Sequence, residues 1–433
     1  MKIHIERTRR KWLKLSLRGL VGLRGFWLLF LPLWGMGGFV SAQTLNDYLG
    51  IAAENNPNVR AAYTEFEAAM QKAPQVSSLP DPSLTMSAFG RMVETRLGAQ
   101  EARFSLMQMF PWFGTLEAKE EASILMAEAS FQQYLDLRKN LFFDIKSVYA
   151  ELYALKKILQ LKNENLEILN SYRELALSRF KSGNSPMVNV VKVDIQLLAA
   201  QTEIELLQEQ VRPLQARFNL LLNREKSASI EVPDTLSLGT VIVPQNIENL
   251  FKEHPSVIGF EKQRESYELQ EVVAEKEGMP MLGLGVDYSI ISKRTDANPE
   301  MNGQDAIMPM LTVTLPIYRK KYRAARKEAE LMARSTELQQ SARINELQYE
   351  YESMVYELQK AERLIELYTR QVTSSDQANK LLISGFSSSI TDFEEVLQMN
   401  QDILLYKAQA VEALKNGLIA EARLEYLLSE IQK

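Results

Sequence analysis

The fold of this chain is decided at Phe110-Pro111-Trp112-Phe113-Gly114, where the pattern of residues changes. Before this stretch apolar and polar residues alternate, and after it 68 residues pass without glycine or proline, as far as Gly183. Alternation with a period of two is typical of a β-strand, and a long run without helix breakers favours a helix. At 1.5 Å per residue that helix would be ~100 Å long. The sequence therefore predicts a strand that leads directly into a very long helix.

The same order of signals returns later in the chain. The corresponding stretch is Leu315-Pro316-Ile317-Tyr318, and another 68 residues without glycine or proline lie between Pro316 and Gly385. Four more pairs of short motifs keep this order, and all five offsets lie between 198 and 206 residues: Asn56-Pro57 with His254-Pro255, Leu79-Pro80 with Met279-Pro280, Ser182-Gly183 with Ser384-Gly385, and Ala216-Arg217 with Ala422-Arg423. Such ordered repetition indicates a duplicated unit. We predict a first repeat over residues 43–235 and a second over 236–433.

Each repeat is predicted to contain a helix, two strands, a long helix and a return helix, which makes the chain mainly α with a small β part. In the first repeat the predicted elements are a helix over 57–78, strands over 82–90 and 103–110, a long helix over 115–182 and a return helix over 186–224. In the second they are a helix over 255–277, strands over 281–291 and 306–315, a long helix over 317–384 and a return helix over 387–430. Gly183 and Gly385 are expected to form the turns of long helical hairpins, because glycine adopts positive φ most easily. The polar segments 91–102 and 292–306 are expected to be loops between strands.

The four predicted strands each have one apolar and one polar face. Each is about nine residues long, which is the length of a tilted strand that crosses a membrane. A two-faced surface hairpin is the alternative for either pair of strands alone, but two such pairs precede two very long helices. Four strands cannot close a membrane barrel, because the unpaired edge amides would lie in hydrocarbon. The strand count therefore predicts that several copies of the chain pool their strands.

The N-terminal residues resemble a secretory signal. Residues 1–24 contain eight basic residues and one acidic residue, and an uncharged apolar run over 25–40 ends in Val40-Ser41-Ala42. This pattern predicts a signal peptide over 1–42 with cleavage near Ala42/Gln43. A retained anchor is the alternative, although Pro32 and the short apolar run make a poor spanning helix. The segment Thr8–Lys14 also resembles a twin-arginine signal, so the export route stays open.

Composition excludes several classes of function. The 433 residues include no cysteine, which excludes disulfide scaffolds, thiol catalysis and a lipid-modified N-terminal cysteine. The only histidines are His4 and His254, and the latter, before Pro255, is expected to be a helix cap or a surface residue. Beyond residue 42 the net charge is −12, which argues against a nucleic-acid partner. No cofactor motif, metal-spaced carboxylate set or transmembrane helix is found there, so we predict no enzyme, and a membrane role would need the strands.

Taken together, the duplicated order of elements resembles the TolC-type outer-membrane efflux proteins. The junction Phe110–Gly114 and the sequence Arg179-Phe180-Lys181-Ser182-Gly183 are similar to that family's strand-to-helix and hairpin-tip motifs. The resemblance implies a homotrimer in the outer membrane, with a 12-stranded β-barrel and a periplasmic α-barrel. It also implies two partners, a periplasmic adaptor and an inner-membrane transporter, most simply of the RND type. The alternative function is that of a periplasmic coiled-coil structural or adaptor protein.

The resemblance also suggests roles for particular residues. The hairpin tips, 182–187 and 384–389, would contact the adaptor through Ser182, Gly183, Asn184, Ser384, Gly385 and Phe386. Pro111, Gly114 and Pro316 would mark the switch from barrel to helix. Asp392, Glu394 and Glu395 would form an acidic ring at the periplasmic gate, or else a solvated acidic helix start. The tyrosine and arginine that lock the gate in well-known members are replaced here by Leu382 and Ser387, which puts that lock in doubt.

Four methionines suggest a possible cargo. Met107, Met109, Met308 and Met310 fall on the polar, lumenal faces of two predicted strands. Thioethers are soft ligands for Cu(I) or Ag(I), which makes a heavy-metal efflux duct conceivable. The alternative is that these methionines fill an irregular wall, as methionine often does.

Overall fold

The computed structural model describes residues 44–239, 247–388 and 390–428, which form one compact unit. The predicted signal peptide and its cleavage site lie outside the described residues. The elements of the first half are α2 (Leu45–Asn55), α3 (Pro57–Met70), α4 (Lys72–Ser77), β1 (Ser83–Thr95), β2 (Gly98–Phe110), α5 (Thr115–Lys181) and α6 (Val188–Leu221). Those of the second half are α7 (Ile247–Lys252), α8 (Pro255–Glu277), β3 (Met281–Ile291), β4 (Ala306–Thr314), α9 (Arg319–Ser387) and α10 (Phe393–Leu428).

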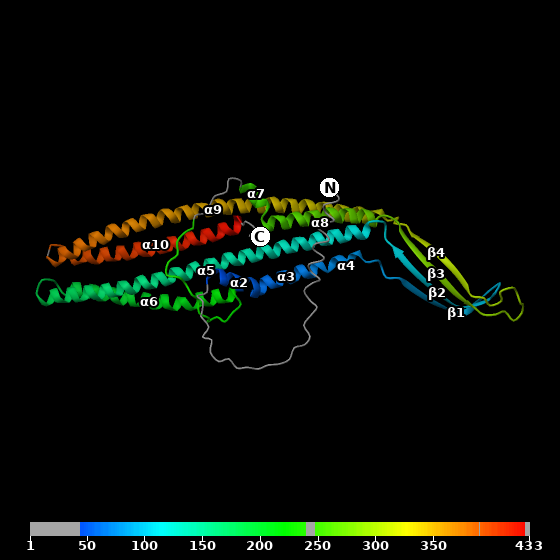
Figure 1. Cartoon of the computed structure of the whole chain (residues 1–433), viewed down its shortest axis with the longest axis horizontal. Coiled ribbons are helices and arrows are strands. Elements are labelled where there is room, and N and C mark those ends of the chain that lie inside the picture. Colours follow the sequence, from blue (N-terminus) through cyan, green and yellow to red (C-terminus); the bar gives the residue numbers. More distant parts are fainter. Residues whose placement is uncertain (1–43, 240–246, 389, 429–433) are drawn as a thin grey trace, which may run out of the picture. The chain divides into compact units, whose positions relative to one another are not determined.

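The long helices form two antiparallel hairpins, α5 with α6 and α9 with α10 (Figure 1). Between the hairpins α5 packs against α10, and α8 lies between α5 and α9. α5 has 67 residues and α9 has 69, as expected for runs without helix breakers. In the described part of the chain, no helix carries an apolar stretch long enough to cross a membrane.

The core of the helical part is divided into three clusters along the helices. One lies at the hairpin tips, where Tyr172 of α5 and Val193 of α6 pack with Phe393 of α10. A second joins α2 to α5 and α6 around Tyr48 and Phe218, and a third joins α9 to α10 around Leu347. A single layer of helices cannot build one thick core, so each crossing buries its own set of side chains.

The strands form one antiparallel sheet in the order β1-β2-β3-β4. The central pair, β2 with β3, joins the two halves of the chain, with Phe104 opposite Tyr288 and Met107 opposite Gly285. Since directly paired residues lie on the same face, one face carries Leu84, Leu106, Val286 and Pro309 in a single row. This face is apolar and exposed, for instance 70% exposed at Leu311.

The predicted loop over 91–102 is wrong. β1 continues to Thr95 and β2 begins at Gly98, so only two residues separate the strands. Beyond an irregularity between Ala88 and Val93, the strands still pair, and the Thr95 hydroxyl donates to the Gly98 carbonyl at 2.7 Å. Glycine and polar residues suggested a loop there. The hydrogen bonds between paired strands join backbone groups, however, so they do not require an apolar side-chain pattern. The second predicted loop agrees with the gap between β3 and β4.

Candidate functional site

The hairpin tips differ from each other in their turns. Gly183 follows α5 with φ 76°, and a Cβ there would meet no atom within 4 Å. Glycine is thus favoured here because of the positive φ, and not because a side chain would clash with a neighbour. Asn184 donates from its side chain to the Ser182 hydroxyl at 3.1 Å, which closes this exposed turn.

The expected turn at Gly385 is wrong. α9 continues past it to Ser387, and Gly385 is not among the described residues with positive φ. Its carbonyl instead accepts the Ile390 amide at 2.9 Å, and a Cβ at this position would collide with the side chain of Thr391. The glycine lets the turn fold back closely onto the helix. The return helix consequently begins at Phe393, not at 387.

Of the predicted adaptor contacts in the second tip, Ser384 is exposed but Phe386 is not. Phe386 is 5% exposed and packs on Phe393, with ring centroids 4.7 Å apart, and the Arg179 guanidinium lies over the Phe386 ring, 4.9 Å from its centroid. A side chain held in this cluster presents little surface to a partner, so the docking role of Phe386 stays a prediction that its burial does not favour. A docking role for the exposed tip residues stays a prediction.

Polar contacts connect the two hairpins near their tips. Arg179 of α5 donates to the Ser387 carbonyl at 2.7 Å, and Lys192 of α6 pairs with Glu394 of α10. Deeper in, two side-chain amides donate across the same boundary, from Asn379 to the Tyr172 hydroxyl at 3.1 Å and from Asn400 to the Asn165 oxygen at 2.8 Å. Sequence reasoning missed these links, because the partners are about 200 residues apart and no local pattern pairs them.

The three predicted gate carboxylates, Asp392, Glu394 and Glu395, are brought together at the start of α10, and all are exposed. Glu394 forms an ion pair with Lys192. Together with Glu395 it also lines a groove of about 710 Å³ between α9 and α10. A helix N-terminus favours carboxylates by itself, so this placement agrees with both interpretations. The ring stays a prediction.

The junction residues lie between strand and helix, as the sequence suggested. Pro111 directly follows β2, and Gly114 has φ 73° as the N-cap of α5. Pro316 occupies the equally short connection from β4 to α9. Two side-chain contacts connect the junctions, from Lys276 to the Phe113 carbonyl at 3.2 Å and from Arg319 to the Gly278 carbonyl at 2.9 Å.

The four methionines share the polar face of the sheet. Met107 and Met310 both lie opposite Gly285, and Met109 lies opposite Gly283. The sulfur of Met109 lies 2.6 Å from where a Cβ of Gly283 would be, and that of Met107 lies 3.2 Å from it. The two glycines therefore make room for the methionine sulfurs of β2. Met308 lies opposite Asp287 on the same face and is 51% exposed.

Asp287 is a buried acid that sequence reasoning did not select. It is 1% exposed on the polar face of β3, and it pairs with Arg103 and accepts from the Ser105 hydroxyl of β2. The alternation Leu-Gly-Val-Asp-Tyr already placed it on the polar face. Its two partners follow only from the register between β2 and β3.

His254 is a cap, as expected, but a surface position is wrong. Its Nδ1 accepts the Ser256 amide at 3.3 Å, and the side chain is completely buried beside Tyr426 and Asp136. Burial, followed by the neighbouring charges of Lys139 and Arg343, lowers its pKa to about 3. A neutral histidine of this kind is a structural group. Among the described residues, no group of three His, Cys, Asp or Glu side chains could hold a metal ion.

The comparisons with known proteins agree with this geometry. The family model described as outer membrane efflux protein matches the chain twice, over residues 48–224 and 246–430. The chain belongs to the outer membrane efflux protein family. The resemblance to TolC-type proteins is thereby confirmed at the level of the family. The family match does not favour the alternative, a periplasmic coiled-coil structural or adaptor protein. No curated protein matches the sequence of this chain.

Solved structures of efflux channels share the fold. The outer membrane protein VceC from Vibrio cholerae has 18% identity and a TM-score of 0.73, covering 89% of this chain and 95% of that one. CusC has 15% identity and a TM-score of 0.76, with 89% and 91% covered. The open-state MtrE outer membrane channel of Neisseria gonorrhoeae has 14% identity and a TM-score of 0.71, with 89% and 88% covered. At such identities the likeness concerns the fold alone, and it includes the mainly helical architecture with its small sheet.

Proposed function

We propose that this efflux-family chain is one subunit of a passive exit duct, through which small molecules or ions leave the periplasm across the outer membrane. The observation that carries the proposal is the sheet: one face is apolar and exposed, the other is polar, and β1 and β4 are its edges. Lipid on the apolar face and water on the polar face would suit this pattern. Three copies would close a 12-stranded barrel and leave no edge amide unpaired. A signal peptide removed near Ala42/Gln43 would deliver the chain to the periplasm.

The duct would work with two partners. A periplasmic adaptor would contact the tips through the exposed residues of 182–187 and 384–388, and an inner-membrane transporter, most simply of the RND type, would supply the energy.

We further propose that the links between hairpins hold the periplasmic entrance shut. Ser387 stands where well-known members have an arginine. Arg179 of the first hairpin would take over its role, because it donates to the Ser387 carbonyl. Lys192 and Glu394 would add a second link. Hydrogen bonds and exposed ion pairs of this kind contribute roughly 0.5–1 kcal/mol each.

Breaking both links should open the duct. We expect the double variant Arg179→Ala, Lys192→Gln to raise the mean conductance of purified protein in planar bilayers at least tenfold, because the closed state loses roughly 1–2 kcal/mol in every subunit. The matched control is Lys162→Gln, which breaks the Lys162–Glu203 pair within one hairpin. An equal rise in the control would contradict the gate. Protein that purifies as a single subunit in plain buffer, without detergent, would contradict the duct itself.

A heavy-metal cargo is a second, narrower candidate. The observation in its favour is that Met107 and Met109 place their sulfurs together over Gly283, on the face shared by Met308 and Met310. Two or three thioethers on one wall would hold Cu(I) or Ag(I) weakly enough for release.

Replacing these four methionines with leucine should lower tolerance to copper or silver salts and spare tolerance to organic drugs. Leucine keeps the apolar volume and removes the soft ligand, so the wall itself should still assemble. The measurement is growth of a strain that carries either version, with outer-membrane protein levels compared. Equal loss of both tolerances would mean that the methionines only fill the wall.

A further inference from the structure

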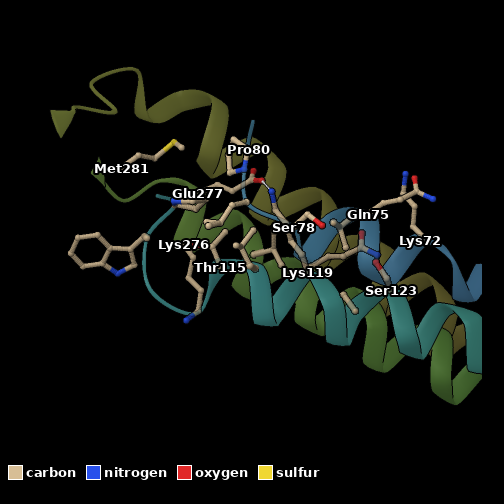
Figure 2. Close-up of a pocket in the computed structure, with 18 of the residues that line it drawn as sticks. Lys72, Gln75, Ser78, Pro80, Thr115, Lys119, Ser123, Lys276, Glu277 and Met281 are labelled. Carbon is tan, nitrogen blue, oxygen red and sulfur yellow. Dashed lines mark ion pairs between the residues drawn. The ribbon is translucent and has the colours of Figure 1, made fainter. Parts of the chain in front are cut away.

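A cavity of about 1130 Å³ lies where the strands meet the helices (Figure 2). Its lining comes from the end of α3, from α4, from the connection before β1, from the junction between β2 and α5, from the first turns of α5, and from the ends of α8 and α9 with the start of β3 between them. The volume is in the range of small-molecule sites. None of the gate, tip or methionine residues discussed above belongs to it.

The lining of this junction cavity is basic. It contains four lysines, Lys72, Lys119, Lys276 and Lys321, against two acidic residues, Asp81 and Glu277. Lys119 pairs with Glu277 at 2.6 Å. Within the described residues, Lys72 and Lys321 have no ion pair, and both are exposed at the cavity. A positive lining is unexpected in a chain with a net charge of −5.

A helix N-terminus and an unpartnered hydroxyl also face the cavity. Thr115, the first residue of α5, is only 3% exposed, and its Oγ1 finds no hydrogen-bond partner among the described residues. It lies in the lining beside Lys119 (Figure 2). The N-cap is Gly114, which supplies no side-chain cap. The cavity runs along one side of α5 from Thr115 to Met126. The positive N-terminal end of this 67-residue helix and a hydroxyl without a partner therefore lie together at one end of the cavity, an arrangement that favours an anion.

The rest of the lining is apolar and aromatic. Val76, Leu116, Met126 and Val273 contribute aliphatic surface, and Trp112 adds an indole that is 38% exposed. A ligand that filled this space would need an apolar body next to its charged group. A small inorganic ion would leave that surface wet.

We propose that the junction cavity binds an amphiphilic anion, with a phosphate, sulfonate or carboxylate group held by Thr115 and the lysines and an apolar body held against Trp112. Such a ligand has two sources. It can be an anionic phospholipid of the surrounding membrane, or a free solute on its way through the duct, and only the second source rests on the proposed function. In either case the site lies apart from the gate.

Trp112 provides a direct probe, because it is the only tryptophan beyond residue 34. The processed protein, purified in a neutral detergent, is titrated with 1-anilinonaphthalene-8-sulfonate, and energy transfer from Trp112 is recorded. N-phenyl-1-naphthylamine, which is the same body without the sulfonate, is the matched neutral probe. A lipid arm uses nanodiscs that contain either phosphatidylglycerol or phosphatidylethanolamine with brominated chains, which quench a nearby indole.

Two variants test the anion site. Lys72→Gln with Lys321→Gln should weaken binding of the sulfonate about tenfold, equivalent to ~1.4 kcal/mol, and leave the neutral probe unchanged. Thr115→Val should also weaken the sulfonate but leave the melting temperature unchanged, since its hydroxyl has no partner in the described residues. The matched control is Lys226→Gln with Lys252→Gln, which removes two exposed lysines outside the cavity.

The outcomes separate the sources and the hypotheses. If brominated phosphatidylglycerol quenches Trp112 more than brominated phosphatidylethanolamine does, and the Lys72/Lys321 variant abolishes this difference, the site binds lipid. If the sulfonate binds better than the neutral probe but the two lipids quench equally, the site binds a solute. Equal binding of the two naphthyl probes with equal quenching by the two lipids would overturn the proposal, as would an equal loss in the control variant. Conductance of the same preparation in bilayers is measured in parallel. A conducting protein without anion preference refutes only this inference, and a protein that never conducts refutes the duct.

Discussion

Replacing Gly285 with alanine should prevent the sheet from assembling, more severely than any other single methyl group added to the polar face. A Cβ at this position would lie 2.7 Å from the carbonyl oxygen of Leu106, which is backbone, and close to the side chain of Met107. A side chain can rotate away, but the carbonyl belongs to the strand that pairs with β3. Relief requires that β2 and β3 move apart, which costs more than the ~1–3 kcal/mol of ordinary overpacking. If three copies pool their strands, each assembled duct bears this cost three times.

Gly283 provides the matched comparison two residues away. There the added Cβ would meet side chains only, the sulfur of Met109 at 2.6 Å and the Cβ of Thr312 at 3.2 Å. We expect Gly283→Ala to assemble in reduced amount and Met109→Ala to restore it, whereas Met107→Ala should not rescue Gly285→Ala. The measurement is the amount of heat-modifiable, detergent-resistant protein in isolated outer membranes. Normal assembly of Gly285→Ala would mean that the register between β2 and β3 differs from the one described.

Acid should destabilise the helical part through His254. Its pKa is about 3 in the folded protein against an ordinary value of 6.5, because burial and the charges of Lys139 and Arg343 disfavour the imidazolium. Between these two values the unfolded chain binds a proton that the folded chain does not. Stability is therefore lost as the pH falls from about 6.5 toward 3, and the loss at pH 4.5 amounts to roughly 3 kcal/mol.

The first repeat suggests the control for this prediction. Asn56 occupies the corresponding N-cap before Pro57, and its side-chain oxygen accepts the Asn58 amide at 2.9 Å. His254→Asn should keep the cap and remove the titration, at a loss of roughly 1 kcal/mol of packing against Tyr426 at every pH. The measurement is the melting temperature by circular dichroism at pH 7 and pH 4.5. An equal decrease in the wild type and the variant would assign the acid sensitivity to other groups.

Much of this fold could be predicted from the sequence, because its elements are punctuated by glycine and proline. The two 68-residue runs predicted α5 and α9, and period-two alternation predicted all four strands. The ends of the elements were less predictable. β1 and β2 extend beyond their apolar segments, where backbone pairing continues without a hydrophobic pattern, and α9 passes through Gly385 because a helix tolerates glycine in its last turn.

The candidate site was less accessible to sequence reasoning than the fold. Arg179 and Lys192 find their partners on the other hairpin, and Asp287 finds Arg103 only through strand register. The junction cavity combines segments that lie far apart in the sequence and has no motif of its own. Contacts between distant segments depend on three-dimensional placement, and a single sequence does not report them.

The pairing of β2 with β3 also affects the order in which the sheet can form during synthesis. Ser105 and Asp287, which meet across this ladder, are 182 residues apart, and the whole of α5 and α6 is synthesised between them. The hairpin of β1 and β2 is thus synthesised long before β3 and β4, and its apolar face stays exposed until they pair with it. Closing so large a loop is slow, and uncovered strand edges invite aggregation in the meantime. We therefore expect such a chain to need protection from aggregation until β2 and β3 have paired.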